Sequence, residues 1–154
     1  MNLSRLFNPK TIAVVGASAD SKSVGYGLFK NLVGGCVYKC KRCAAFTGKV
    51  YPINPNHKEI LGIKAYPDLS SVKERIDLAI IAVPARIVPA IARQCALKKV
   101  GGVIIISAGF AESGAEGAKL QDETVEALKG IPMIGPNCLG ILIPQEHLKA
   151  SFAP

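Results

Sequence analysis

With 154 residues, 49% of them hydrophobic, the chain is long enough to bury the core of one domain without disulfides or metal. No apolar run approaches the roughly 18 residues of a membrane span, and residues 1–10 lack the apolar segment of a secretory signal, so we expect a soluble cytoplasmic protein. Five cysteines, an odd number, argue against a closed disulfide framework and for a reducing compartment.

The net charge of +8 is concentrated in the first part of the chain. Residues 1–60 carry nine Lys and Arg against two acidic residues, a balance of +7, whereas residues 61–154 carry ten against nine. A basic region suits a polyanionic ligand, although an excess of basic residues more often forms a solvated surface without a ligand. Nucleic acid is not expected as a partner, because the aromatic residues do not interleave with the basic ones as a stacking platform requires.

Short apolar strands alternate with helical stretches along the chain. The expected strands are Thr11–Val15, Lys49–Ile53, Asp77–Val83, Gly102–Ser107 and Pro132–Ile134. The expected helices are Gly25–Val33, Ile87–Lys99 and Ala115–Leu128, with a shorter one near Leu69–Arg75. Residues 78–83 and 103–106 are continuous apolar runs, which are typical of strands covered on both faces. The pattern predicts an α/β fold: a Rossmann-like, doubly wound, mainly parallel five-stranded sheet with helices on both faces.

The turn after the first strand, residues 14–26, has the composition of a phosphate-binding turn. Gly16 and the Ser and Asp residues behind it supply turn chemistry and helix caps, and the next helix would offer backbone N–H groups to an anion. The G-x-G-x-x-G fingerprint of dinucleotide-binding domains is absent. A longer, Ser-rich turn leaves room for a ligand that carries phosphates but no second nucleoside.

The end of the second strand argues against NAD as the ligand. A nicotinamide-binding domain places Asp or Glu there to hold the ribose hydroxyl groups. This chain has Asn54 instead, followed by Pro55, Asn56, His57 and Lys58. A neutral, partly basic segment favours an adenine nucleotide with an additional phosphate.

Five motifs at the expected strand ends occur in order along the chain. They are Gly16-Ala17-Ser18, residues 50–55, residues 76–85, residues 108–114 and residues 134–140. Together they resemble the CoA-binding N-terminal domain of the NDP-forming acyl-CoA synthetases. That family includes the ADP-forming acetyl-CoA synthetases and the alpha subunit of succinyl-CoA ligase. The resemblance covers roughly residues 12–154, and five weak motifs in register form a specific pattern.

The resemblance implies coenzyme A as the ligand and assigns residues to its parts. The CoA phosphates would lie on Gly16, Ala17, Ser18, Ser23, Val24 and Gly25. The adenosine end would lie on Asn54, Pro55 and Asn56, with His57 or Lys58 as candidates for a phosphate. The pantetheine arm would pass Val83, Pro84, Ala85, Ser107, Ala108 and Gly109, toward the turn at Gly135, Pro136, Asn137 and Cys138. Taken singly, each residue also has a structural explanation as a cap, turn or strand end.

Members of that family continue into a second domain with a phosphorylated histidine and need an ATP-grasp domain or subunit. We therefore expect a CoA-binding domain in residues 1–143 and, in residues 144–154, a tail that resembles the start of the second domain. The two histidines, His57 and His147, do not stand at the phosphohistidine position. The chain alone is expected to bind CoA without completing the ligase cycle and to have no catalytic residues. Its expected partners are those domains or subunits, or a second copy of itself.

Three cysteines, Cys36, Cys40 and Cys43, are clustered before the second strand. The C-x3-C-x2-C spacing is the one by which radical-SAM enzymes hold an iron–sulfur cluster, and zinc would need a fourth ligand such as His57. Reduced thiols made reactive by basic neighbours are the alternative. Of the other cysteines, Cys95 is expected to pack in a helix.

Two other functions stay open at this stage. One is a stand-alone or regulatory CoA-binding protein, a sensor without ligase activity. The other is a redox-responsive nucleotide-binding regulator that uses the cysteine cluster.

Overall fold

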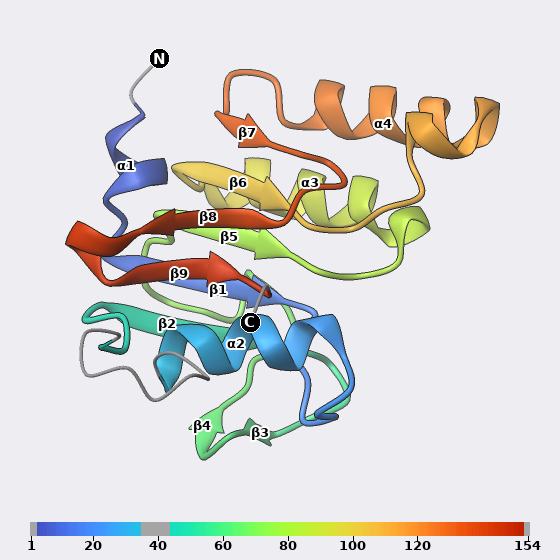
Figure 1. Ribbon diagram of the computed structural model, residues 1–154. Coiled ribbons are helices and arrows are strands. Elements are labelled where there is room, and N and C mark those ends of the chain that lie inside the picture. Colours follow the sequence, from blue (N-terminus) through green and yellow to red (C-terminus); the bar gives the residue numbers. More distant parts are fainter. Residues whose placement is uncertain (1–2, 35–43, 153–154) are drawn as a thin grey trace.

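The computed structural model describes residues 3–34 and 44–152. At its centre lies a five-stranded sheet in the order β2-β1-β5-β6-β7 (Figure 1). The strands are β1 (Thr11–Val15), β2 (Lys49–Ile53), β5 (Leu78–Ile81), β6 (Gly102–Ile105) and β7 (Met133–Ile134). Every neighbouring pair is parallel. The predicted Rossmann-like α/β fold is confirmed, although β5 and β6 each end two residues earlier than predicted.

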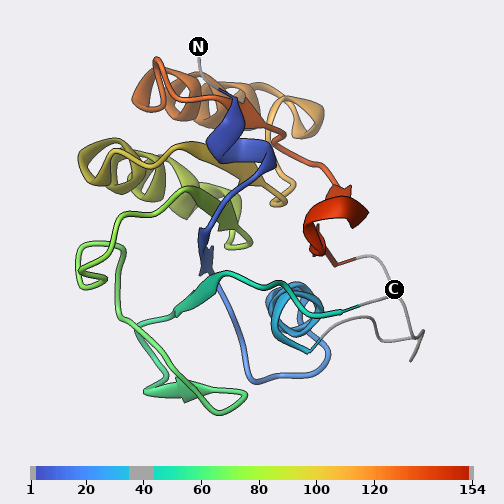
Figure 2. The same cartoon turned by 90° about the vertical axis from the view of Figure 1, so that its left-hand side faces the viewer.

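Three longer helices cover the two faces of the sheet. α2 (Val24–Val33) lies on one face, and α3 (Val88–Lys98) and α4 (Ala115–Ala127) lie on the other (Figure 2). The shorter elements are α1 (Ser4–Phe7) and the 3-10 turns η1 (Ala85–Ile87), η2 (Ala111–Ser113) and η3 (Pro144–Glu146). Among the described residues, no helix is long and apolar enough to cross a membrane.

One sheet supports two hydrophobic cores because alternate side chains of each strand point to opposite faces. Ile12 and Ile80 belong to the core on the α2 side, together with Phe29. Val103 belongs to the core on the α3 side, together with Cys95. All five side chains are fully buried, as expected where helices cover both faces. Cys95 therefore packs as predicted, and burial raises the pKa of its thiol to about 12.

The connection between β2 and β5 differs from the prediction. It contains a small hairpin of β3 (Glu59–Ile60) and β4 (Ile63–Lys64), which the sequence analysis missed. The short helix expected near Leu69–Arg75 does not form in this described stretch, so that prediction was wrong. The Asp68 carboxylate accepts hydrogen bonds from the hydroxyl groups of Ser70 and Ser71 and from the Ser71 N–H. Such local bonds compete with helical ones.

A C-terminal hairpin of β8 (Gly140–Ile143) and β9 (Leu148–Ser151) packs beside α2 (Figures 1 and 2). The Asn31 side-chain amide in α2 donates a 2.7 Å hydrogen bond to the Ser151 carbonyl. The predicted division after residue 143 falls between the two strands of this hairpin. Residues up to 151 are therefore in contact with the sheet domain.

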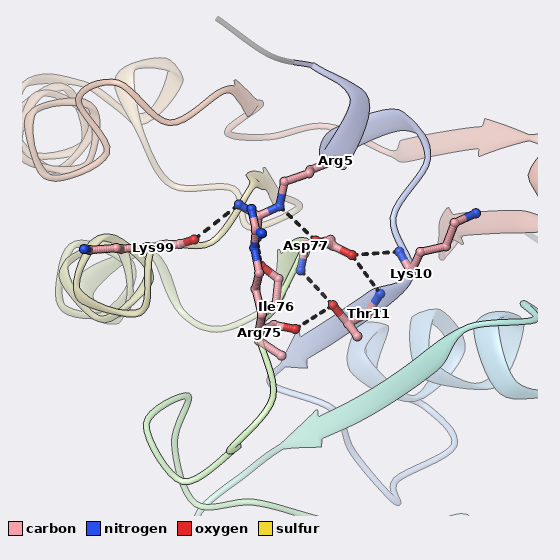
Figure 3. A network of polar contacts seen from close by, with 7 residues as sticks. All are labelled: Arg5, Lys10, Thr11, Arg75, Ile76, Asp77 and Lys99. Carbon is pink, nitrogen blue, oxygen red and sulfur yellow. Dashed lines mark hydrogen bonds and ion pairs between the residues drawn. The ribbon is translucent and has the colours of Figure 1, made fainter.

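Polar contacts fasten α1 to the amino ends of the strands (Figure 3). Arg5 Nε donates to Asp77 Oδ1 at 2.8 Å, and an Arg5 terminal nitrogen donates to the Ile76 carbonyl at 2.6 Å. Asp77 Oδ2 accepts from the backbone N–H groups of Lys10 and Thr11. Burial alone would raise the Asp77 pKa, but the hydrogen bonds from Arg5 and the Lys10 backbone outweigh it and lower that pKa. The hydrogen bonds of Arg5 and Asp77 thus hold α1 against the amino ends of the strands.

Candidate functional site

Two cavities open at the carboxyl edge of the sheet, one on each side of the end of β5. Both are lined by Ala82, Val83 and Pro84. Strand order changes direction between β1 and β5, and in open α/β sheets ligands bind outside the carboxyl ends at such a switch point. The cavities therefore lie where this fold places ligands.

The first, which we name the Asn54 cavity, has a volume of about 520 Å³. The predicted site residues that line it are Gly16, Ser18, Ser23, Asn54, Pro55, Asn56, Val83 and Pro84. The second, which we name the Asn137 cavity, has a volume of about 480 Å³. The predicted residues that line it are Val24, Val83, Pro84, Ser107, Ala108 and Asn137. Both volumes fall in the range usual for small-molecule sites.

Other predicted site residues lie near the cavities without lining them. They are Ala17, Gly25, Lys58, Ala85, Gly109 and Pro136. Ala17 is fully buried beneath the turn, and Lys58 is exposed beyond Asn56. The structure thus brings most of the predicted residues together and leaves these as supports or at the rim.

The first turn needs glycine at two positions. Gly16 has φ +89°, and a Cβ there would lie 2.3 Å from the Ala82 carbonyl oxygen. A Cβ on Gly25 would lie 1.9 Å from the Gly16 carbonyl oxygen. The absence of side chains lets the turn pack against both β5 and the first turn of α2.

The same turn offers backbone donors to a ligand. The N–H groups of Ala17, Ser18, Val24 and Gly25 find no acceptor among the described residues. Donors of this kind at a helix N-terminus attract anions, because the helix dipole adds to their partial charge. The Ser23 hydroxyl is already used: it accepts from the Tyr26 N–H at 3.1 Å and donates to the Asp20 carbonyl at 2.8 Å.

Side chains also brace the ends of the strands. Asn54 Nδ2 donates to the Ala17 carbonyl at 2.8 Å, and its Oδ1 accepts from the Asn56 N–H at 2.9 Å. Ser107 Oγ donates to the Val83 carbonyl at 2.5 Å and accepts from the Val83 N–H at 3.2 Å. Asn54 and Ser107 thus position the backbone around the cavities.

The thiol of Cys138 borders the Asn137 cavity. Its Sγ donates to the Ile105 carbonyl at 3.3 Å. Burial raises the pKa of this thiol, so it stays protonated at neutral pH. Cys138 therefore helps to shape the cavity wall and is no ready nucleophile.

Five residues of the Asn54 cavity were missed by the sequence analysis: Pro67, Asp68, Ile87, Ile91 and Gln94. Three of them, Ile87, Ile91 and Gln94, follow the helical spacing i, i+4, i+7, which could have revealed a shared face directly after β5. Asp68 carries no such local signal. The β3–β4 connection brings it back beside β2, where the Asn54 N–H donates to the Tyr66 carbonyl at 2.8 Å.

The predicted cysteine cluster, Cys36, Cys40 and Cys43, lies outside the described residues. His57, its suggested fourth metal ligand, is exposed. Within residues 3–34 and 44–152, no three His, Cys, Asp or Glu side chains gather as a metal site would require.

Comparison with known proteins places the chain in a family. Residues 10–144 match the CoA binding domain family. The chain belongs to this CoA-binding family. Coenzyme A is thereby confirmed as the predicted ligand class.

The relatives of this CoA-binding domain include ADP-forming acetate–CoA ligases. It is 43% identical over 153 residues to acetate–CoA ligase [ADP-forming] I of Archaeoglobus fulgidus, covering 98% of this chain and 21% of that protein. It is 43% identical to the alpha subunit of acetate–CoA ligase [ADP-forming] II of Pyrococcus furiosus, covering 97% of this chain and 31% of the subunit. The chain thus spans a fifth to a third of these relatives.

A solved structure shows the same fold. Acetyl-coenzyme A synthetase 1 of Ca. Korarchaeum cryptofilum, in complex with phosphate and ADP, superposes with a TM-score of 0.88 at 39% identity. The match covers 99% of this chain and 31% of that one. The CoA-binding domain therefore matches about a third of that synthetase chain.

Proposed function

We propose that this CoA-binding domain serves an ADP-forming acyl-CoA synthetase, and that one CoA molecule lies across the end of β5. The observation that carries the proposal is the wall of Ala82, Val83 and Pro84 shared by the two cavities. An extended ligand can occupy both cavities only by crossing that wall. CoA has this shape, with a nucleotide at one end and a thin pantetheine arm at the other.

The Asn54 cavity suits the nucleotide end of CoA. From the first turn, Gly16, Ser18 and Ser23 line it. The N–H groups of Ala17, Ser18, Val24 and Gly25, which have no acceptor among the described residues, would receive the diphosphate. Lys58, on the exposed rim next to Asn56, is the candidate for the 3′-phosphate. Its ammonium group would act as a point charge on a flexible stem.

The Asn137 cavity suits the pantetheine arm. Its lining is largely apolar and includes Val24, Leu139 and Phe152. Ser107, Ala108 and Asn137 also line it. The Asn137 N–H already donates to the Ser107 carbonyl at 2.9 Å, so the Ala108 backbone and the Asn137 side chain would serve the amide groups of the arm. The thiol would then emerge near Asn137 and Cys138, where the acyl group is received.

The chemical steps of acyl-CoA synthesis would take place on other domains or subunits of the synthetase. His57 and His147 are exposed and lie away from the lining of both cavities. Acid activation and phosphoryl transfer would come from the phosphohistidine and ATP-grasp domains or subunits. This chain, mixed with acetate, ATP and CoA, is expected to bind CoA without forming acetyl-CoA.

Calorimetric titration of the chain with CoA, dephospho-CoA and NADH tests the proposal. We expect CoA to bind more tightly than dephospho-CoA, and NADH to bind weakly or not at all. Lys58→Ala should reduce the preference for CoA over dephospho-CoA, whereas Lys64→Ala, on the β3–β4 hairpin, should leave it unchanged. A preference of the wild-type chain for NADH would overturn the assignment.

A further inference from the structure

One residue of the Asn54 cavity carries a buried polar atom that makes no hydrogen bond to the described residues. Gln94 lines this cavity from α3, and its Oε1 is buried without a hydrogen-bond partner among the described residues. An unpaired buried acceptor costs about 1–3 kcal/mol, so such groups are rare in folded proteins and call for an explanation. A ligand that brings its own donor supplies one.

The surroundings of Gln94 fit a flat aromatic base. Pro67, Ile87 and Ile91 line the same cavity and provide apolar contact area. Gly16 and Ser18 of the first turn line this cavity too. Phosphates on the turn and a base against α3 therefore occupy one continuous space.

We propose that Gln94 recognises the edge of the adenine base. This inference rests on the proposed function and adds base selectivity to it. A glutamine amide presents an acceptor and a donor side by side, and adenine presents the N6 amino donor beside the N7 acceptor. Gln94 Oε1 accepts from N6, and Nε2 donates to N7. The last torsion of a glutamine side chain is soft, so the amide turns its oxygen toward the cavity when the base enters.

Asp68 strengthens the same selectivity. Its carboxylate lines the cavity, and hydrogen bonds from Ser70 and Ser71 hold its pKa below the ordinary value, so it stays an acceptor. Hypoxanthine and guanine carry a carbonyl oxygen at position 6 where adenine carries an amino group. In those bases the oxygen would face the Gln94 Oε1 acceptor, in a cavity that the negatively charged Asp68 also lines.

The test compares adenosine 3′,5′-bisphosphate with inosine 3′,5′-bisphosphate by calorimetry on the full chain. A bidentate glutamine–adenine pair discriminates by about 1–3 kcal/mol, so the wild-type chain should prefer the adenine compound by about fivefold or more. Gln94→Met keeps the volume but removes the amide, and should abolish most of this preference. Gln94→Glu keeps an acceptor for N6 and should retain part of it. Gln145→Leu, an exposed glutamine outside the cavity, is the matched control.

The possible failures are distinguishable. Equal affinity of the wild-type chain for the two bisphosphates would overturn the role of Gln94 while leaving CoA binding intact. An unchanged preference in a folded Gln94→Met variant, verified by circular dichroism, would overturn it too. If Gln94→Met does not fold, the Gln94→Glu variant decides the question. A reduced preference for the adenine compound supports the role of Gln94, and an unchanged preference overturns it. Failure of the wild-type chain to bind CoA would overturn the proposed function and this inference with it.

Discussion

The side-chain amide of Asn54, at the end of β2, donates a 2.8 Å hydrogen bond to the backbone carbonyl of Ala17 in the first turn. The position that holds a ribose in dinucleotide-binding domains here braces the turn at Gly16 instead. The bond joins two segments 37 residues apart in the sequence. The Ala17 and Ser18 N–H groups thereby keep the orientation that an anion needs.

Asn54→Ala is expected to weaken CoA binding by about tenfold, because the turn loses its brace and must be ordered by the ligand. The free energy of unfolding should fall by only about 1 kcal/mol, the net value of one hydrogen bond. Calorimetry and urea unfolding measure the two effects. Asn8→Ala, at the opposite edge of the sheet, should leave CoA affinity unchanged; equal losses in both variants would contradict the bracing role.

Two glycines of α2 are expected to respond in opposite ways to alanine. At Gly25 the new Cβ would lie 1.9 Å from the Gly16 carbonyl oxygen, so Gly25→Ala should lower the free energy of unfolding by more than about 2 kcal/mol and abolish CoA binding. At Gly27 the nearest atom is 3.9 Å away, so Gly27→Ala should raise stability by about 0.5–1 kcal/mol. Urea unfolding of the two variants provides the check. Similar free energies of unfolding would show that Gly25 does not lie so close to the Gly16 carbonyl oxygen.

The Asn137 cavity should bind the part of CoA that adenosine 3′,5′-bisphosphate lacks. Leu139→Asp places a charge on the cavity lining and should weaken CoA binding by about fivefold, since it removes roughly 1 kcal/mol of apolar contact. Affinity for the bisphosphate should not change. Leu142 is similarly exposed but lies outside the cavity, so Leu142→Asp is the control. A loss for both ligands would mean that the arm does not lie there.

Asp77 should make stability depend on pH. Its pKa in the folded chain lies below the ordinary 3.8, so its charge stabilises the fold above about pH 3.8, and this contribution disappears as the pH falls through the lowered pKa. Asp77→Asn should therefore lower the free energy of unfolding by about 1–3 kcal/mol at neutral pH and by much less near pH 2. Urea unfolding at both pH values measures the difference. Glu126→Gln, from an exposed ion pair, should change little; a pH-independent effect of Asp77→Asn would refute the charge-based explanation.

The fold could be read from the sequence because each central strand is a continuous apolar run with helices of clear period between them. Residues 78–81 and 102–105 are fully buried on both faces, and no other arrangement covers such strands as simply. The turn at Gly16 could also be predicted, because the preferences of glycine and serine for turns and helix caps depend on the local sequence. The β3–β4 hairpin was not, since its strands are only two residues long and follow no apolar alternation.

The site was predicted best where a strand simply ends and worst where distant segments meet. Asn54 follows β2 directly, and Val83 and Ser107 stand two residues after the ends of β5 and β6; all three lie at the cavities as expected. Asp68 and Phe152 reach the cavities through tertiary packing, the first by the β3–β4 connection and the second by the β8–β9 hairpin. Contacts of that kind leave no periodic signal in the sequence.

The most direct test of the central claim is a backbone amide titration by NMR, with CoA added to the labelled chain. CoA lying across the end of β5 should shift the amide signals of Ala17, Ser18, Gly25, Val83 and Ser107 together. Amides at the amino ends of the strands, such as those of Thr11 and Asp77, should not move. Shifts confined to that amino edge, or absent from the Gly16 turn, would contradict the account.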